Sequence, residues 1–442
     1  MKILEEIKAS RLARDTGHLA TGQGLRLVIQ AAYFVLLARI LGPDKYGAFV
    51  AIVSLASILA PFSGLGTTNL FVKNVASGKR DPEVCWGNGL AATIVSGTAF
   101  SGLAFAISYS LHLRVPFSAL VAVCISDLFL LRVIELAYFG FAGMDRMKES
   151  AILSVTGSLP RLIAISLLLV WRHPVTLQRW AGAYLAATVF SCLYATYRAH
   201  KLWGAPRFNW TFLREDVAEG VYFSIGVSAA TIYNDIDKVM LGRISFAAGG
   251  IYAAAYRIVD VSMTPIRSLA SAAYPHFFRR GVDGMRPAHA YAITHIRRAF
   301  IYSAILFVVL WLFAPLLPLV LGANYAQTAL ALRWLALLPI LRSGHVFLAD
   351  SLSGAGFQGV RSAIQAAIAA VNIALNIVIL PRYGWLGAAW TSLASDGLLL
   401  LCLWVAVQSK LRTATHLTTR PDNPQGEGQQ SMSEVAPIVE TT

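Results

Sequence analysis

The sequence has 442 residues, of which 56% are hydrophobic and 14% charged, and its formal net charge is +14 at pH 7. A mean hydropathy of +0.60 is too high for a soluble protein of this length, so the composition indicates an integral membrane protein. The apolar runs lack the two-residue alternation of a membrane β-barrel strand, which leaves helices as the spanning elements.

Twelve apolar stretches are long enough to cross about 30 Å of hydrocarbon. The tenth is expected to break near Pro339, because proline cannot continue a helix undisturbed. The predicted spans are 18–40, 46–66, 84–111, 117–141, 150–171, 180–200, 217–241, 248–275, 295–321, 328–349, 358–380 and 386–408.

The basic residues between these spans predict the orientation of the chain. With the N-terminus inside, cytoplasmic segments hold 22 Lys and Arg residues and the opposite segments hold 7. Cytoplasmic loops are normally the richer in basic residues, so both termini are predicted to be cytoplasmic. Because topology accounts for the basic excess, we expect no nucleic-acid partner.

The order of polar and apolar segments predicts four regions. Residues 1–15 form a short amphipathic cytoplasmic N-terminus, and residues 413–442 form a polar, disordered cytoplasmic tail. The longest polar connection, near 201–216, divides the spans into an N-lobe at 16–205 and a C-lobe at 206–412. Leu41-Gly42 and Leu241-Gly242 end the first and seventh spans, which indicates a repeat or a chance match in a Leu- and Gly-rich chain.

Fifteen charged residues are assigned to the membrane interior, fourteen within the predicted spans and Asp350 one residue beyond the tenth, while other charged residues close to the span ends are counted with the loops. Exposing all of them to lipid would cost about 40 kcal/mol or more, so they must be paired or must face a watered cavity. A polar cavity among many membrane helices predicts a transport path. The charged residues are Arg26, Arg132, Arg161, Lys238, Arg257, Arg267, Arg333 and Arg342 with Asp127, Glu135, Asp235, Asp237, Asp260, Asp350 and Asp396.

Polar residues recur on one face of three predicted helices. They are Gln23, Arg26, Gln30 and Tyr33 in the first span, Ser224, Ser228, Thr231, Asp235 and Lys238 in the seventh, and Arg257, Asp260, Thr264 and Arg267 in the eighth. Such stripes either hold the bundle together or line a cavity. Arg132 with Glu135, and Arg257 with Asp260, are spaced to pair within one helix. Arg26 has no acidic residue deeper in its own span, which indicates that it binds an anion.

Several features bear on chemistry and energy supply. The sequence contains no phosphate-binding loop motif, no metal-ligand spacing among its histidines and cysteines, and no large loop to house catalytic residues. We therefore expect a transporter rather than an enzyme, without a metal or organic cofactor. If transport is coupled, a proton or sodium gradient remains, and Asp235, Asp237, Asp260 and Asp396 either bind the coupling ion or balance nearby cations.

Four motifs resemble the polysaccharide-biosynthesis flippases, the O-antigen and exopolysaccharide exporters of the multidrug/oligosaccharidyl-lipid/polysaccharide superfamily. The likeness extends from about residue 15 to 410. The motifs are ARILGPDKYGAF at 38–49, GLG at 64–66, GGIYAAAYRI at 249–258 and PRYGWLGAAWT at 381–391.

The resemblance implies two six-helix lobes around a central cavity that opens to either side in turn. It implies a bacterial inner-membrane protein that moves an oligosaccharide linked to undecaprenyl pyrophosphate. Its implied partners are this lipid-linked oligosaccharide and the membrane lipids, and polysaccharide polymerase machinery is a further candidate. Related lipid-linked precursor flippases place a cation in the first helix, which matches Arg26. The pyrophosphate needs cationic donors, and the predicted cavity residues are Arg26, Gln30, Lys238, Arg257 and Arg267.

Two other functions stay open. A multidrug extruder of the same superfamily would need an acidic cavity for its cations, whereas the intramembrane charges here are eight basic and seven acidic. A membrane enzyme of glycan assembly would need a catalytic carboxylate or histidine in a sizeable periplasmic loop.

Overall fold

The structure is a computed structural model that describes residues 2–170 and 174–418. In these residues every regular element is helical, so the expected all-α fold is confirmed. Residue 171, which ends the predicted fifth span, and residues 419–442 of the predicted tail lie outside the described residues.

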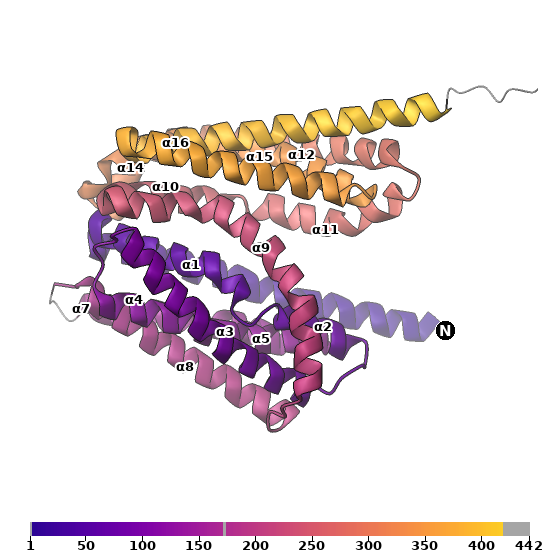
Figure 1. The fold of residues 1–442 in the computed structure, drawn as a ribbon, viewed down its shortest axis with the longest axis horizontal. Coiled ribbons are helices and arrows are strands. Elements are labelled where there is room, and N and C mark those ends of the chain that lie inside the picture. The colour runs from indigo at the N-terminus through magenta and orange to yellow at the C-terminus, as the bar shows by residue number, and fades with distance from the viewer. Residues whose placement is uncertain (1, 171–173, 419–442) are drawn as a thin grey trace, which may run out of the picture.

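Helices α1 to α8 form the first lobe, drawn in indigo to magenta in Figure 1. One apolar core joins α1, α3, α4 and α8, and another joins α2, α3, α5 and α8. The elements are α1 (Lys2–Leu59), the short η1 (Ala60–Phe62), α2 (Thr67–Ala76), α3 (Pro82–Ser110), α4 (Phe117–Cys124), the π-helical turn η2 (Ile125–Leu130), α5 (Leu131–Gly143), α6 (Met147–Thr156), α7 (Leu159–Val170) and α8 (Leu177–Trp203).

Helices α10 to α16 form the second lobe, and α9 connects the two. The second lobe has its own apolar cores, built mainly from α10, α12, α14, α15 and α16. The elements are α9 (Trp210–Ile244), α10 (Phe246–Ser262), α11 (Thr264–Gly281), α12 (Met285–Phe313), η3 (Ala314–Leu316), α13 (Leu317–Leu321), η4 (Ala323–Tyr325), α14 (Ala326–Leu335), α15 (Leu338–Gly354) and α16 (Gln358–Thr418).

Two glycine kinks fold the longest helices back on themselves. Gly42 in α1 has φ 69° and precedes Pro43, while Gly384 in α16 has φ 56° and follows Pro381. Glycine tolerates this left-handed conformation and proline disrupts a helix, so each long helix holds two predicted spans. Both kinks lie at one end of the bundle, which we call the turn end. The opposite end, where α1 begins and α16 ends, is the terminal end (Figure 1).

The predicted spans all lie largely in helices. By length and composition, six helical stretches of the described chain could each cross a membrane, or seven if the bent pair α14 and α15 counts as one. That pair bends by 41° between Leu335 and Leu338, so the predicted break near Pro339 is confirmed. The total of twelve spans stays a prediction.

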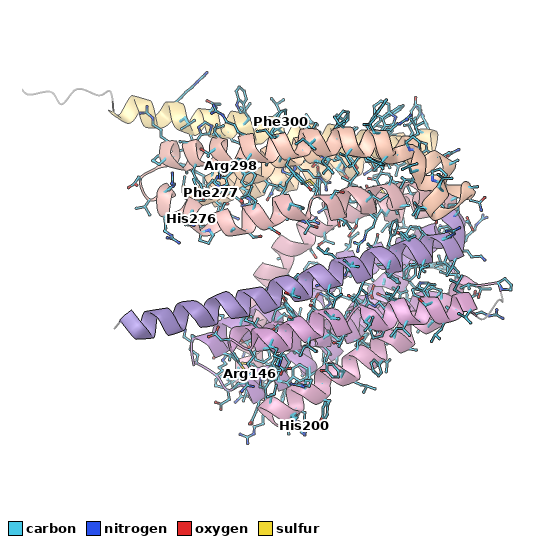
Figure 2. All side chains as sticks on the ribbon, turned by 180° about the vertical axis from the view of Figure 1, so that it is seen from behind. Arg146, His200, His276, Phe277, Arg298 and Phe300 are labelled. Atoms are coloured by element: carbon cyan, nitrogen blue, oxygen red, sulfur yellow. The ribbon has the colours of Figure 1, made fainter. Side chains whose placement is uncertain are left out.

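The two lobes diverge toward the terminal end and meet at the turn end (Figure 1). Seen from behind, Figure 2 shows the same divergence, with His276 and Phe277 of α11 on one lobe and Arg146 and His200 on the other. Contacts between α1 and the second half of the chain run chiefly to α9 and α10.

Helix α9 crosses from the first lobe to the second (Figure 1). Its first turns are tied to the first lobe by Arg80, which forms ion pairs with Glu215 at 2.7 Å and Asp216 at 2.5 Å. Its last turns are tied to the second lobe, where the Tyr233 hydroxyl donates to Asp396 of α16 at 2.7 Å. One helix thus carries a rigid attachment to each lobe.

Candidate functional site

A cavity of about 690 Å³ lies between the lobes and is lined by α1, α7 and α8 on one side and by α9, α10, α11, α15 and α16 on the other. The exposed fraction of its cationic side chains rises from 7% at Lys238 to 39% at Arg257 and 51% at Arg267. Lys238 lies near the end of α9 at the turn end, and Arg267 lies on α11, which runs to the terminal end. The cavity therefore opens toward the terminal end.

Lys238 is held at the bottom of the cavity by neighbours on its own helix. Its ammonium group forms an ion pair with Asp235 at 2.8 Å, lies 3.5 Å from Asp237 and donates to the Asn234 carbonyl. It also lies 4.1 Å from the centre of the Tyr256 ring. Two carboxylates and an aromatic face offset the cost of burying this charge.

Asp396 is the centre of a second buried cluster. It is fully buried on α16 and accepts hydrogen bonds from Arg342 at 3.0 Å and from Tyr233 at 2.7 Å, with His345 at 3.2 Å. Arg342 also donates to the Tyr256 hydroxyl at 2.7 Å. Three helices, α9, α15 and α16, converge on this one carboxylate. Asp396 is thus committed to an ion pair in this state.

Asp260 is shared by two arginines near the mouth of the cavity. Arg267 is its closer partner, at 2.6 Å, while Arg257 lies at 3.7 Å. Arg257 also donates to the Gln30 side chain of α1 at 3.3 Å, and this bond joins the two lobes. The pairing of Arg257 with Asp260 is present, but it is the looser of the two.

Asp237 and Gln30 lie just outside the lining of the cavity. Asp237 is buried and accepts hydrogen bonds from the Tyr252 hydroxyl and from the Lys238 backbone N–H at 2.7 Å. Gln30 borders a smaller apolar pocket of about 240 Å³ between α1 and α10, α13. Within residues 2–170 and 174–418, no group of three or more His, Cys, Asp or Glu side chains is arranged to hold a metal ion.

Arg26 lies on α1, half-buried, outside the cavity lining and seven residues before Tyr33, which does line it. The charges of Glu135, Arg161 and Arg257 act on it at longer range. Glu135 is itself paired with Arg132 at 2.6 Å, as its spacing predicted. In the described chain Arg26 forms no ion pair, and its role as an anion ligand stays a prediction.

The first-lobe wall contains an arginine that the polar stripes did not single out. Arg161 of α7 lines the cavity with its guanidinium carbon 4.6 Å from the centre of the Tyr184 ring. Arg342 and His345 on α15 were also missed. The absence of any acidic residue from the predicted fifth span could have identified Arg161 by the same reasoning that identified Arg26.

The lining carries more positive than negative charge. Each acidic residue has a close basic partner, which leaves Arg161 unpaired and Arg257 only loosely paired. Such an excess favours an anionic ligand over a cationic one. The basic residues of the lining are Arg161, Lys238, Arg257, Arg267 and Arg342, and the acidic ones are Asp235, Asp260 and Asp396.

The turn end of the cavity is sealed by close contact between α1 and α10. A Cβ atom at Gly47 would lie 1.8 Å from the Phe246 carbonyl oxygen, and one at Gly250 would lie 1.9 Å from the Pro43 carbonyl oxygen. Only glycine permits such an approach of the two backbones. These residues follow the two Leu-Gly pairs of the predicted repeat, so the matching motifs of the two lobes meet here.

Comparison with known sequences identifies the family. The sequence pattern of the polysaccharide biosynthesis protein family matches residues 12–280, more than half of the chain. The protein belongs to this family, which confirms the resemblance found in the motifs. No curated protein sequence matches the chain closely enough to add to this.

Solved membrane transporters share the fold. An inward-facing multidrug resistance MATE family transporter of the MOP superfamily is 14% identical over 90% of this chain and 96% of that chain, with a TM-score of 0.71. The lipid II flippase MurJ, in an inward closed conformation, is 12% identical over 92% and 93%, with a TM-score of 0.71. A MOP superfamily transporter from Pyrococcus furiosus, described as having a binding pocket of reverse polarity, is 15% identical over 92% and 96%, with a TM-score of 0.61. At these identities the likeness shows the fold of a multi-pass membrane transporter.

Proposed function

We propose that this protein is a flippase that moves an oligosaccharide linked to undecaprenyl pyrophosphate across the bacterial cytoplasmic membrane, for O-antigen or exopolysaccharide assembly. The observation that carries the proposal is the surplus of cations in a cavity shared by two lobes, in a member of the polysaccharide biosynthesis family. A pyrophosphate cannot cross hydrocarbon bare, and guanidinium groups can replace its water with directed hydrogen bonds.

The loops support one orientation in the membrane. The segments predicted to be cytoplasmic hold 22 basic residues against 7 in the opposite segments, which supports a cytoplasmic terminal end. The cavity would then face the cytoplasm and the glycine seal would face the periplasm. The chain superposes better on the inward-facing MATE transporter, with a TM-score of 0.71, than on the outward-facing one, with 0.58, which supports the same orientation.

Alternating access requires that the seal at the turn end open while the terminal end closes. The interlobe contacts that must separate are the Gly47 and Gly250 crossing and the hydrogen bond from the Tyr325 hydroxyl to the Ala38 carbonyl at 3.0 Å. The glycan and pyrophosphate would pass between the lobes, and the lipid tail would remain in the bilayer.

Coupling to a proton or sodium gradient is part of the proposal, with Asp235, Asp237, Asp260 and Asp396 as its candidates. In the present state Asp235, Asp260 and Asp396 each neutralise a cation within 3.0 Å. A coupling ion at any of the three would therefore compete with that cation, so ion binding would free a basic group in the cavity.

A multidrug extruder is the second candidate, supported by the shared fold with MATE transporters. An organic cation would have to enter a cavity with five basic and three acidic residues. Like charges disfavour this, so we rank it below the flippase.

The test is a flipping assay in proteoliposomes with a fluorescent undecaprenyl-pyrophosphate trisaccharide. The intact protein is expected to move it, and Arg257→Ala and Arg26→Ala are expected to slow the movement at least about ten-fold, with partial recovery in Arg26→Lys. Exposed Arg243, at the end of α9 and outside the cavity lining, gives the control Arg243→Ala. Dissipating the proton and sodium gradients separately identifies the coupling ion. Unchanged flipping in both Ala variants would remove the anion-site argument.

A further inference from the structure

Arg161 is a partly buried cation with two guanidinium nitrogens that have no hydrogen-bond partner in the described chain. It lies on α7, in a predicted span that contains no acidic residue, and it lines the central cavity. Its Nε and Nη2 atoms are buried and have no hydrogen-bond partner in the described chain. A buried guanidinium with unmet donors is costly, so it persists only where stability is not the sole demand on the residue.

The two unmet atoms lie on the same edge of the guanidinium group. Their N–H bonds are parallel, which is the fork that binds two oxygens of one carboxylate or phosphate. The Tyr184 ring lies under the plane of the group, at 4.6 Å, and fixes it without using the fork. Arg161 thus has two adjacent donors for an oxyanion that the described chain does not supply.

Three groups around Arg161 favour its positive charge. They are Asp127, Tyr184 and Tyr33, with Arg26 adding a like charge from α1. Asp127 lies on the π-helical turn η2 and already accepts the Tyr184 hydroxyl at 2.7 Å. It forms no ion pair with Arg161, so it provides a nearby countercharge but no direct contact. Asp127 and Glu135 therefore act on Arg161 and Arg26 from a distance, and neither forms an ion pair with these two arginines in the described chain.

We propose that Arg161 is the first-lobe ligand for the anionic headgroup of the substrate, acting opposite Arg257 of the second lobe, and that the charge of Asp127 competes with that headgroup for Arg161. The proposal rests on the flippase function for the identity of that anion, a diphosphate. Because the fork is buried, binding requires the guanidinium to turn away from the wall about its last side-chain bonds. A diphosphate has two phosphate groups to offer, so it can engage an arginine from each lobe at once.

Arg333 provides a matched control for this proposal. It also stacks on an aromatic ring, with its guanidinium carbon 4.6 Å from the centre of Trp311, and its Nε is also buried without a partner. It lies on α14, outside the cavity lining. Any effect that arises merely from removing a stacked, buried arginine should appear equally in Arg333→Gln.

The experiment measures the binding of farnesyl pyrophosphate, farnesyl monophosphate and farnesol to the purified full-length protein in nanodiscs, by titration calorimetry. Arg161→Gln is expected to weaken pyrophosphate binding at least about ten-fold and to reduce the preference for pyrophosphate over monophosphate. Arg161→Lys keeps the charge but not the fork, so its affinity for pyrophosphate should lie between those of the intact protein and of Arg161→Gln. Asp127→Asn keeps an acceptor for Tyr184, removes the competing charge and should tighten binding several-fold.

The outcomes separate this inference from the proposed function. If the intact protein binds pyrophosphate no better than farnesol, the flippase proposal fails and this inference falls with it. Suppose instead that the intact protein prefers pyrophosphate. If Arg161→Gln keeps that preference, or if Arg333→Gln weakens binding as much as Arg161→Gln does, the role of Arg161 is refuted while the flippase proposal stands. Thermal unfolding of each variant checks its fold, and Asp127→Asn and Arg161→Lys carry the test if Arg161→Gln does not fold.

Discussion

Replacing Gly47 by alanine should push the lobes apart at the turn end. The added Cβ atom would stand 1.8 Å from the Phe246 carbonyl oxygen and 2.6 Å from the Gly250 amide nitrogen, both backbone atoms that cannot rotate away. Ordinary contact begins near 3.4 Å, so α1 and α10 must separate by about 1.6 Å. The substitution therefore acts against the state with a closed turn end.

The size of the effect follows from the cost of overpacking. Inserting a methyl group into a closely packed contact costs about 1–3 kcal/mol. A cost of about 2 kcal/mol changes the ratio of closed to open turn ends about 30-fold. The open state does not contain the contact between Gly47 and α10, so only the closed state bears this cost. A protein whose turn end is mainly closed would then populate the open state measurably.

Spin labels can measure this shift. Asp44 beside the α1 kink and Arg382 beside the α16 kink are both exposed, so cysteines placed there carry a label on each lobe. Electron-spin distance measurements should show a population with a longer distance between the two labels in Gly47→Ala. Gly102→Ala should show none, because an added Cβ there meets nothing within 4 Å. An identical distance distribution in both variants would refute the view that this crossing seals the cavity.

Three further predictions concern contacts outside the glycine seal. Tyr325→Phe removes the interlobe bond to Ala38 and should favour the open turn end by about 1 kcal/mol, seen with the same labels; no change would mean that the bond does not hold the seal. Asp396→Ala leaves Arg342 buried without its carboxylate and should lower the free energy of unfolding by about 3–5 kcal/mol, measured by chemical denaturation. The double variant Arg342→Met with Asp396→Leu should regain most of that stability. An equal loss of stability in the single and the double variant would contradict this. Arg80→Gln breaks a largely buried attachment of α9 and should speed amide hydrogen exchange at residues 210–220. Arg207 pairs with Glu83 and its side chain is 71% exposed, so Arg207→Gln should leave that exchange unchanged. Equal effects of the two substitutions would exclude a special role for Arg80.

The sequence was sufficient for the architecture because the bilayer imposes simple constraints on composition. Apolar length predicted the helices, and Pro339 predicted the break between α14 and α15. The repeated Leu-Gly pairs stay a prediction, although the glycines that follow them, Gly47 and Gly250, meet across the lobes.

The partners of the charged residues could be predicted only within one helix. Arg132 with Glu135 followed from a spacing of three residues, but the closest partner of Asp260 is Arg267, beyond the junction of α10 and α11. Asp396 appeared on its own helix beside Ser392, yet its partners come from α9 and α15. Such contacts depend on how separate helices pack, which no periodicity in one segment reveals.

The central claim is that the cavity carries an anionic, lipid-linked glycan rather than a cationic drug. Proteoliposomes containing the intact protein can be offered two substrates side by side, the fluorescent undecaprenyl-pyrophosphate trisaccharide and ethidium. The cationic surplus of the cavity predicts movement of the lipid-linked glycan, its inhibition by excess farnesyl pyrophosphate and no transport of ethidium. Transport of ethidium with no movement of the glycan would contradict the account.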